Sequence, residues 1–209
     1  MANFTAKDVQ SLRQTTGAGM MDAKKALEET GGDAEAAKKL LREKGLAKAS
    51  DRSDRENVEG VVSAAVGSEV AVLVELKCET DFVAKSDAFI QLTDDLAQAY
   101  AASGQEGIDS LAHTVDDLKV TLKENIEVGR TVRVDLEPGQ VVDTYLHRQE
   151  GRGVNGVIVV LSGGSEELAH DIAVHVAFTK PEYLTREQVP VDDVAEEREA
   201  LRKISLAEG

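Results

Sequence analysis

A glycine-rich hexapeptide is the chain's nearest approach to a known chemical motif. "GRGVNG" (residues 151–156) has the G-x-G-x-x-G spacing with which a backbone can cradle a pyrophosphate. That site needs a strand before the glycines and a helix after them, because the pyrophosphate rests on the N-terminus of the helix. Here "YLHRQE" precedes the motif and the apolar run "GVIVVL" follows it, so a strand leads out. We therefore expect a hairpin tip and no bound cofactor.

The histidines and the cysteine do not suggest a metal site or a nucleophile. His170 and His175 point about 140° apart on a helix, whereas one metal is held from i and i+4. His175 lies between two valines and is expected to be a packed or hydrogen-bonded structural histidine. Cys78 ends an apolar run with acids nearby, which raises a thiol pKa and lowers its reactivity. No G-x-S-x-G elbow is present. The sequence thus predicts no metal, no catalytic residue and no enzyme.

The charge of the chain is unevenly distributed. The net charge is −15; residues 1–55 carry 11 Lys and Arg against 9 Asp and Glu, whereas the remainder carries 13 against 30. Such an acidic body repels phosphate backbones, and no run approaches the ~20 apolar residues that span a bilayer. We expect no nucleic-acid partner and no membrane partner. The N-terminus has no apolar signal region and a single cysteine suits a reducing compartment, so we expect a cytoplasmic protein.

The N-terminal residues predict a small helical bundle. Thr5 followed by an acid three residues later forms a capping box, and "TTGAG" ends this first helix. A second helix fits residues 21–29, and a third fits residues 34–44, with Asp33 as its cap and Gly45 as its stop. We predict a three-helix domain over residues 1–45. The polar stretch "AKASDRSDREN" then predicts a linker over residues 46–57.

The remaining residues, 58–209, predict an α+β core in which an antiparallel sheet is covered by helices. "VEGVVSAAV" and "VAVLVELK" read as strands joined by a hairpin turn, and three further strand candidates lie between residues 126 and 163. Helices are expected at about 81–102, from Thr114 to about 125, at 165–179 after the Ser165 cap, and near the C-terminus. Hairpin-linked strands with segregated helices indicate α+β architecture and not a doubly wound sheet.

Two apolar features are placed where a core does not need them. Met20 and Met21 are adjacent, so both cannot face the interior of a bundle, and methionine is common at protein-binding surfaces. The other interpretation packs Met20 beneath the loop and exposes only Met21. Phe82 follows a polar corner, "CET", at the start of a helix. It is either an exposed contact residue or the first core residue of that helix on one face with Phe89; spacing alone leaves both open.

Longer motifs carry a resemblance to a known family. "LRQTTGAGMMDAKKALEET", "GGDAEAAKKLLREKG" and "ETDFVAKSDAF" resemble elongation factor Ts, the nucleotide-exchange factor for elongation factor Tu, as do "KENIEVGR", "TYLH" and "HDIAVHVAFTKPEYL". The resemblance implies a ubiquitin-associated-like N-terminal bundle that contacts the nucleotide-binding domain of elongation factor Tu. It implies binding to the GDP-bound and nucleotide-free partner, with GDP release as the outcome, and it leaves a homodimer open.

The resemblance also assigns partner-binding residues. Those in the bundle match contact positions, Asp81 and Phe82 match the pair that enters beside the partner's magnesium and phosphates, and one residue in "TYLH" matches a core contact. The full expected set is Arg13, Met20, Met21, Thr80, Asp81, Phe82, Val83 and His147.

The chain departs from the family pattern in places, and the sequence also allows a second function. Members often have Ile-Gly before "ENI", where this chain has Leu122 and Lys123, and they usually continue past "LAEG". A short form and a truncated chain both remain open, and neither a duplicated core nor a helical hairpin insertion is visible. The alternative function is a ubiquitin-associated-like adaptor without exchange activity, which would need only the bundle.

Overall fold

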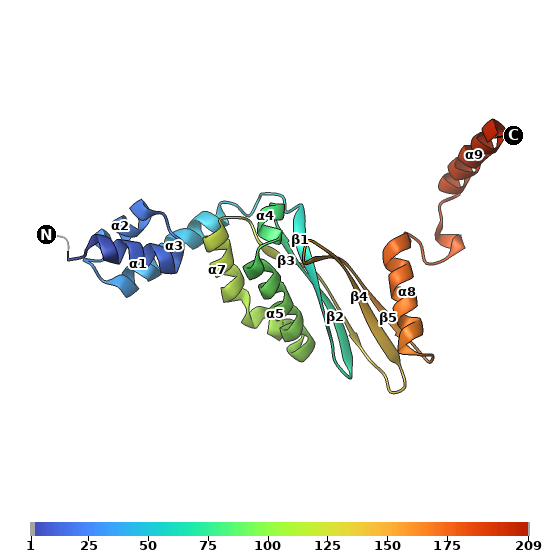
Figure 1. The fold of residues 1–209 in the computed structure, drawn as a ribbon, viewed down its shortest axis with the longest axis horizontal. Coiled ribbons are helices and arrows are strands. Elements are labelled where there is room, and N and C mark those ends of the chain that lie inside the picture. Colours follow the sequence, from blue (N-terminus) through green and yellow to red (C-terminus); the bar gives the residue numbers. More distant parts are fainter. Residues whose placement is uncertain (1–2, 209) are drawn as a thin grey trace.

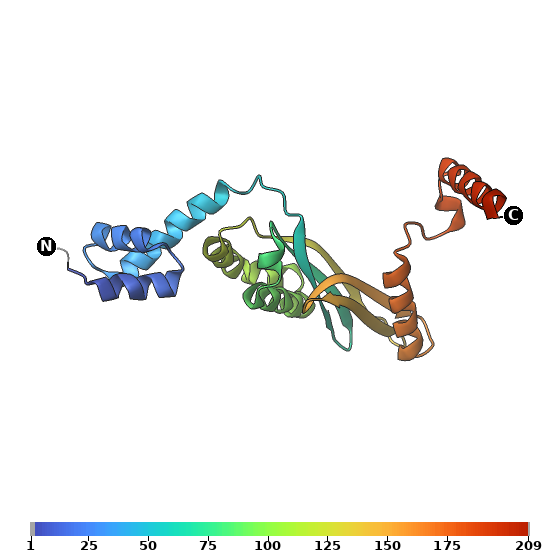
Figure 2. The same ribbon diagram turned by 45° about the horizontal axis from the view of Figure 1, so that its top comes forward.

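The computed structural model describes residues 3–208 as an elongated chain of helical and sheet layers (Figure 1). The N-terminal helices lie at one end and the C-terminal helix lies at the other. Between them, helices cover a three-stranded sheet, a two-stranded sheet follows, and one more helix covers that second sheet (Figures 1 and 2). The predicted α+β class is confirmed. Among the described residues no helix combines the length and the apolar character needed to cross a bilayer.

The N-terminal bundle consists of α1 (Ala6–Thr16), α2 (Met20–Glu29) and α3 (Ala34–Ser50). The predicted capping box is present: Thr5 accepts from the Asp8 amide, and Asp8 accepts from the Thr5 amide at 2.7 Å. The Asp33 cap is also confirmed, since its carboxylate accepts two amides at the start of α3. Small and aliphatic side chains form the core of the bundle, namely Val9, Leu12, Ala23, Ala26, Leu27 and Ala37.

The third helix does not stop at Gly45 as predicted but continues to Ser50, through the first residues of the expected linker. The glycine has a packing role instead. A Cβ at Gly45 would lie 2.4 Å from a methyl group of Val120 in α7, so only glycine lets these two helices approach so closely. Residues 51–54 form turns, and Arg55 lies in a bend. The division into a separable bundle, a linker and a core stays a prediction.

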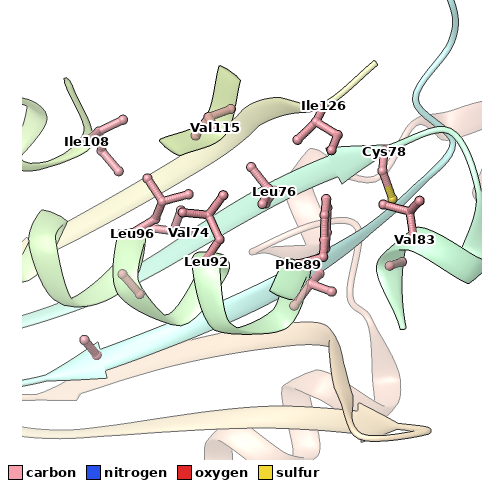
Figure 3. Close-up of a cluster of buried hydrophobic side chains, with 14 of the residues drawn as sticks. Val74, Leu76, Cys78, Val83, Phe89, Leu92, Leu96, Ile108, Val115 and Ile126 are labelled. Atoms are coloured by element: carbon pink, nitrogen blue, oxygen red, sulfur yellow. The ribbon is translucent and has the colours of Figure 1, made fainter. Parts of the chain in front are cut away.

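The three-stranded sheet contains β1 (Glu59–Val66), β2 (Val70–Cys78) and β3 (Glu127–Asp135), all antiparallel in the order β1-β2-β3. The helices α4 (Asp81–Ala84), α5 (Asp87–Ser103), α6 (Gln105–Ser110) and α7 (Ala112–Leu122) connect β2 to β3. Their apolar side chains meet the sheet: Phe89, Leu92 and Leu96 of α5 lie against Val74 and Leu76 of β2 (Figure 3). These are among the most deeply buried residues of the chain.

Two helix predictions in this region are wrong in detail. The single helix expected over residues 81–102 is divided, because Lys85 ends α4 and Ser86 adopts an extended conformation (ψ 139°) before α5 begins. The helix expected to start at Thr114 begins two residues earlier, at Ala112, and has no side-chain cap. The division matters most, because Phe82 and Phe89 then belong to different helices and need not share a face.

The second sheet is the hairpin of β4 (Val141–Gln149) and β5 (Arg152–Leu161), covered by α8 (Glu166–Thr179). Ser165 caps α8 as predicted, and Ala169, Ala173 and Ala177 form its buried face. A short 3-10 turn, η1 (Arg186–Gln188), and α9 (Val191–Glu208) complete the chain. The expectation that His175 is packed is wrong: it lies on the exposed side of α8.

The "GRGVNG" segment forms no helix-capped cradle, but only its start is a hairpin tip. The turn is made by Glu150 and Gly151, both at positive φ, and residues 152–156 already belong to β5. Gly153 lies where a Cβ would meet the carbonyl oxygen of Val62 in β1 at 2.1 Å. The glycine therefore permits the second sheet to pack on the backbone of the first, as glycine does where two backbones approach closely.

Candidate partner-binding site

The corner after β2 holds four of the expected contact residues. Thr80 has extended backbone angles, and its hydroxyl accepts the Val83 amide, which starts α4. Val83 is only 8% exposed and lies in the core beside Cys78 (Figure 3). Phe82 is 83% exposed. The interpretation of Phe82 as a core residue is therefore wrong, and Val83 anchors the corner that presents it.

Glu124, which lies between α7 and β3, braces this corner from a distant part of the sequence. Its carboxylate accepts the backbone amides of Glu79 (3.0 Å) and Thr80 (3.1 Å) and the Thr80 hydroxyl (2.5 Å). Hydrogen bonds to an ionised group are stronger than neutral ones. The three bonds fix the backbone immediately before Asp81 and Phe82.

A second network ties the same corner to the segment that leaves the N-terminal bundle. Glu79 accepts the Asn125 amide at 2.6 Å and lies 3.3 Å from an Arg55 guanidinium nitrogen. The side-chain amide of Asn125, which is buried, donates to the carbonyls of Ser53 and Arg55. Glu124 and Asn125 were not predicted as site residues, although they belong to the quoted segment "KENIEVGR". Their effect is to hold the corner rigid.

Lys85 connects the corner to the tip of the β4–β5 hairpin. Its ammonium group lies 2.7 Å from the Asp81 carboxylate and 2.6 Å from that of Glu150. The hydrogen bond from Lys85 lowers the pKa of Asp81, and the bonds to Asp81 and Glu150 raise the pKa of Lys85. Asp81 is thus ionised at neutral pH and oriented next to Phe82.

The other expected residues lie on two further surfaces. Met20 and Met21 begin α2 and are 48% and 62% exposed, so the interpretation that packs Met20 beneath the loop is not supported. Arg13 is exposed on α1, one turn before Gly17 ends that helix. His147 is exposed on β4, with its ring centroid 6.5 Å from that of Tyr145 and a strand irregularity directly after it. Through Lys85 and Glu150, the His147 hairpin is connected to the Phe82 corner, whereas the bundle residues form a separate surface.

The single cysteine of the chain lies at the base of this corner, where its Sγ donates to the Thr80 carbonyl. Cys78 is fully buried, and burial, followed by the nearby carboxylates of Glu124 and Glu59, raises its pKa to about 12. A thiol with so high a pKa is a poor nucleophile. Within residues 3–208, no three histidine, cysteine or acidic side chains form a group that could hold a metal ion.

Comparison with known proteins assigns the family. A model of the family described as "Elongation factor TS" matches residues 79–209, more than half of the chain, starting at the corner itself. Elongation factor Ts of Pseudarthrobacter chlorophenolicus is 44% identical over an alignment that covers the whole chain and 80% of that protein. The factor of Micrococcus luteus is equally similar, again over the whole chain and 80% of its own length. The chain belongs to the elongation factor Ts family.

Membership of the elongation factor Ts family gives the chain a role in translation elongation. The family match covers Thr80, Asp81, Phe82, Val83 and His147, and the full-length similarity to elongation factor Ts extends to the N-terminal bundle. The buried apolar strand, the braced corner and the exposed phenylalanine are thus features of an elongation factor Ts chain.

Proposed function

We propose that the chain binds elongation factor Tu and promotes GDP release by inserting Phe82 beside the magnesium and phosphates of the bound nucleotide. The observation that carries this proposal is a large aromatic side chain that is 83% exposed on a backbone fixed by long-range hydrogen bonds. Anchors of this kind contribute much of the binding energy at protein interfaces. Preorganisation of the corner lowers the entropy lost on binding.

In this mechanism the chain needs no catalytic residues of its own. A guanine nucleotide is held largely through its phosphates and Mg²⁺, so a partner that displaces these contacts accelerates release without any acid, base or nucleophile. Asp81, ionised and oriented by Lys85, would act in the same contact. Arg13, Met20 and Met21 would supply a second docking surface on the nucleotide-binding domain. Since translation elongation in bacteria is cytoplasmic, we infer that the protein works there.

Competition with nucleotide tests the proposal directly. Two ligands that oppose each other must do so reciprocally, so GDP has to weaken the complex by the factor by which the complex weakens GDP binding. Purified elongation factor Tu should be retained by the immobilised chain without nucleotide and released by excess GDP with Mg²⁺. Retention that GDP does not affect would refute exchange.

The adaptor alternative makes a different prediction for the same experiment. An adaptor that uses only α1, α2 and α3 would bind elongation factor Tu equally well after Phe82→Ala, and GDP would not release it. The exposure of Met20 and Met21 is compatible with either function, so the Phe82 variant is the measurement that separates them.

A further inference from the structure

A pocket lies where the N-terminal bundle meets α7, away from the Phe82 corner. It has a volume of about 400 Å³ and is lined by the α1–α2 turn, by α3 and by the C-terminal part of α7. This volume is within the range of small-molecule sites, roughly 300–1,000 Å³. Gly45 allows the walls to come together, because a Cβ there would lie 2.4 Å from a methyl group of Val120 in α7.

The lining of this pocket is strongly basic, although the chain as a whole carries a net charge of −15. Among residues 3–208, four of its lysines make no ion pair or side-chain hydrogen bond: Lys25, Lys38, Lys48 and Lys123. Of the described residues that line it, two are acidic, and one of these, Asp117, is already paired with Arg42 at 2.7 Å. Four uncompensated ammonium groups around one cavity favour an anion with several charges.

A half-buried arginine adds a further cation to the lining. Arg52 lines the pocket and donates from Nη2 to the carbonyl of Lys119 at 3.2 Å. Its Nε is covered by protein atoms, so only the terminal part of the guanidinium group can face a ligand. This group adds a positive charge to the lining, and phosphate oxygens are among the strongest acceptors for a guanidinium group.

Lys123 lines the pocket from a backbone conformation that is unfavourable for lysine. It ends α7 in the left-handed conformation (φ 61°, ψ 28°), where glycine is the favoured residue. A lysine at this position adds a cation that glycine would not supply. Leu41, Val120 and Ala18 provide an apolar part of the same lining, against which a ribose or a base can pack.

We propose that this pocket binds a small molecule that carries a pyrophosphate or a longer phosphate chain, such as a nucleoside diphosphate. Lys25, Lys38 and Lys48 come from the bundle, whereas Lys123 comes from the end of α7. The bound phosphates therefore join the bundle to the core by bridging cations from both. This inference is independent of the proposed exchange activity, since the pocket contains none of the expected contact residues for elongation factor Tu.

Calorimetric titration of the full chain at low ionic strength tests the site with three probes: inorganic phosphate, inorganic pyrophosphate and GDP. We expect pyrophosphate to bind more tightly than phosphate, and we expect added salt to weaken binding because it screens exposed charges. Equal affinities for GDP and pyrophosphate indicate recognition of phosphates alone, whereas tighter GDP binding adds a contact with the apolar part; both support the site. Absence of heat and of any rise in melting temperature with millimolar pyrophosphate overturns it.

Neighbouring lysines on α3 provide a matched control. Lys38 lines the pocket, whereas Lys39 is also exposed on the same helix but does not line it. Lys38→Ala should weaken pyrophosphate binding several-fold, and Lys39→Ala should leave it unchanged. Equal effects of the two variants would mean unspecific attraction and would overturn the proposal.

Lys123→Gly separates binding from folding. Glycine suits the left-handed backbone, so the melting temperature of the free protein should not fall. Pyrophosphate affinity should drop about tenfold, the scale of one lost charge-assisted hydrogen bond. Pyrophosphate should also slow proteolytic cleavage at Arg52 and Arg55 in the unsubstituted protein. Full affinity in Lys123→Gly, or pocket variants that impair only binding of elongation factor Tu, would overturn the proposal.

Discussion

Replacing Phe82 by alanine should separate partner binding from folding. Phe82 is 83% exposed, so about one sixth of its surface is buried. A fully buried phenylalanine covers roughly 150–250 Å², which leaves about 35 Å² here and about 1 kcal/mol at ~25 cal/mol per Å². The free energy of unfolding should therefore fall by no more than about 1 kcal/mol. At an interface, loss of an aromatic anchor costs about 2 kcal/mol or more, which corresponds to about 30-fold in affinity.

Phe89 is the matched control, because it is the same residue type, belongs to the next helix and is fully buried. Phe89→Ala should cost roughly 3–5 kcal/mol of unfolding free energy, the usual range for a phenylalanine lost from a core. The assays are chemical denaturation and stopped-flow release of a fluorescent GDP analogue from elongation factor Tu. Phe82→Ala should slow stimulated release about 30-fold and unfold almost normally. Normal release by a Phe82→Ala protein that is as destabilised as Phe89→Ala would refute the reasoning.

Three further predictions concern the residues that support the corner and the sheets. Glu124→Ala should cost roughly 1.5–3 kcal/mol of unfolding free energy, because three donors lose a charged acceptor. The same variant should exchange the hydrogen of the Thr80 amide faster, and an unchanged exchange rate would contradict the role of Glu124 in fixing the corner. Cys78, with a pKa of about 12 in the folded protein against 9.0 for an ordinary thiol, should resist a thiol reagent at pH 8 until the protein unfolds. Its contribution to stability should be complete below pH 9 and decline as the pH rises toward 12, since only the unfolded thiol then releases its proton; a stability that stays flat over this range would contradict the burial. Gly153→Ala should lower the melting temperature clearly, because the added Cβ forces β5 away from Val62. Gly151→Ala should lower the melting temperature less, because it acts only through the positive φ of that residue. Equal decreases in melting temperature would refute the close approach of the two sheets.

Local chemistry allowed the sequence to predict most elements of the fold. A capping box needs only Thr5 and Asp8, and the Ser165 cap needs only the amides that follow it, so both are encoded within a few residues. The apolar runs of β1 and β2 and their short connection likewise specify a hairpin locally. The family motifs, including the corner from Thr80 to Val83, can also be recognised from the sequence alone.

Two of the errors fall where residues distant in sequence meet. Gly45 and Gly153 have the sequence appearance of a helix stop and a turn, but their role is to admit Val120 and Val62, which are far along the chain.

The Phe82 corner likewise combines features that the sequence predicts with features that depend on tertiary contacts. The sequence contains Phe82, but spacing alone could place it either in the core or in solvent. Its exposure depends on the division of the helix at Ser86 and on burial of Val83 beneath the corner. Its rigidity depends on Glu124, 44 residues from Thr80 in the chain. Composition and periodicity carry no information about such pairings, because side chains so far apart in sequence are brought together only by the packing of the sheets and helices between them.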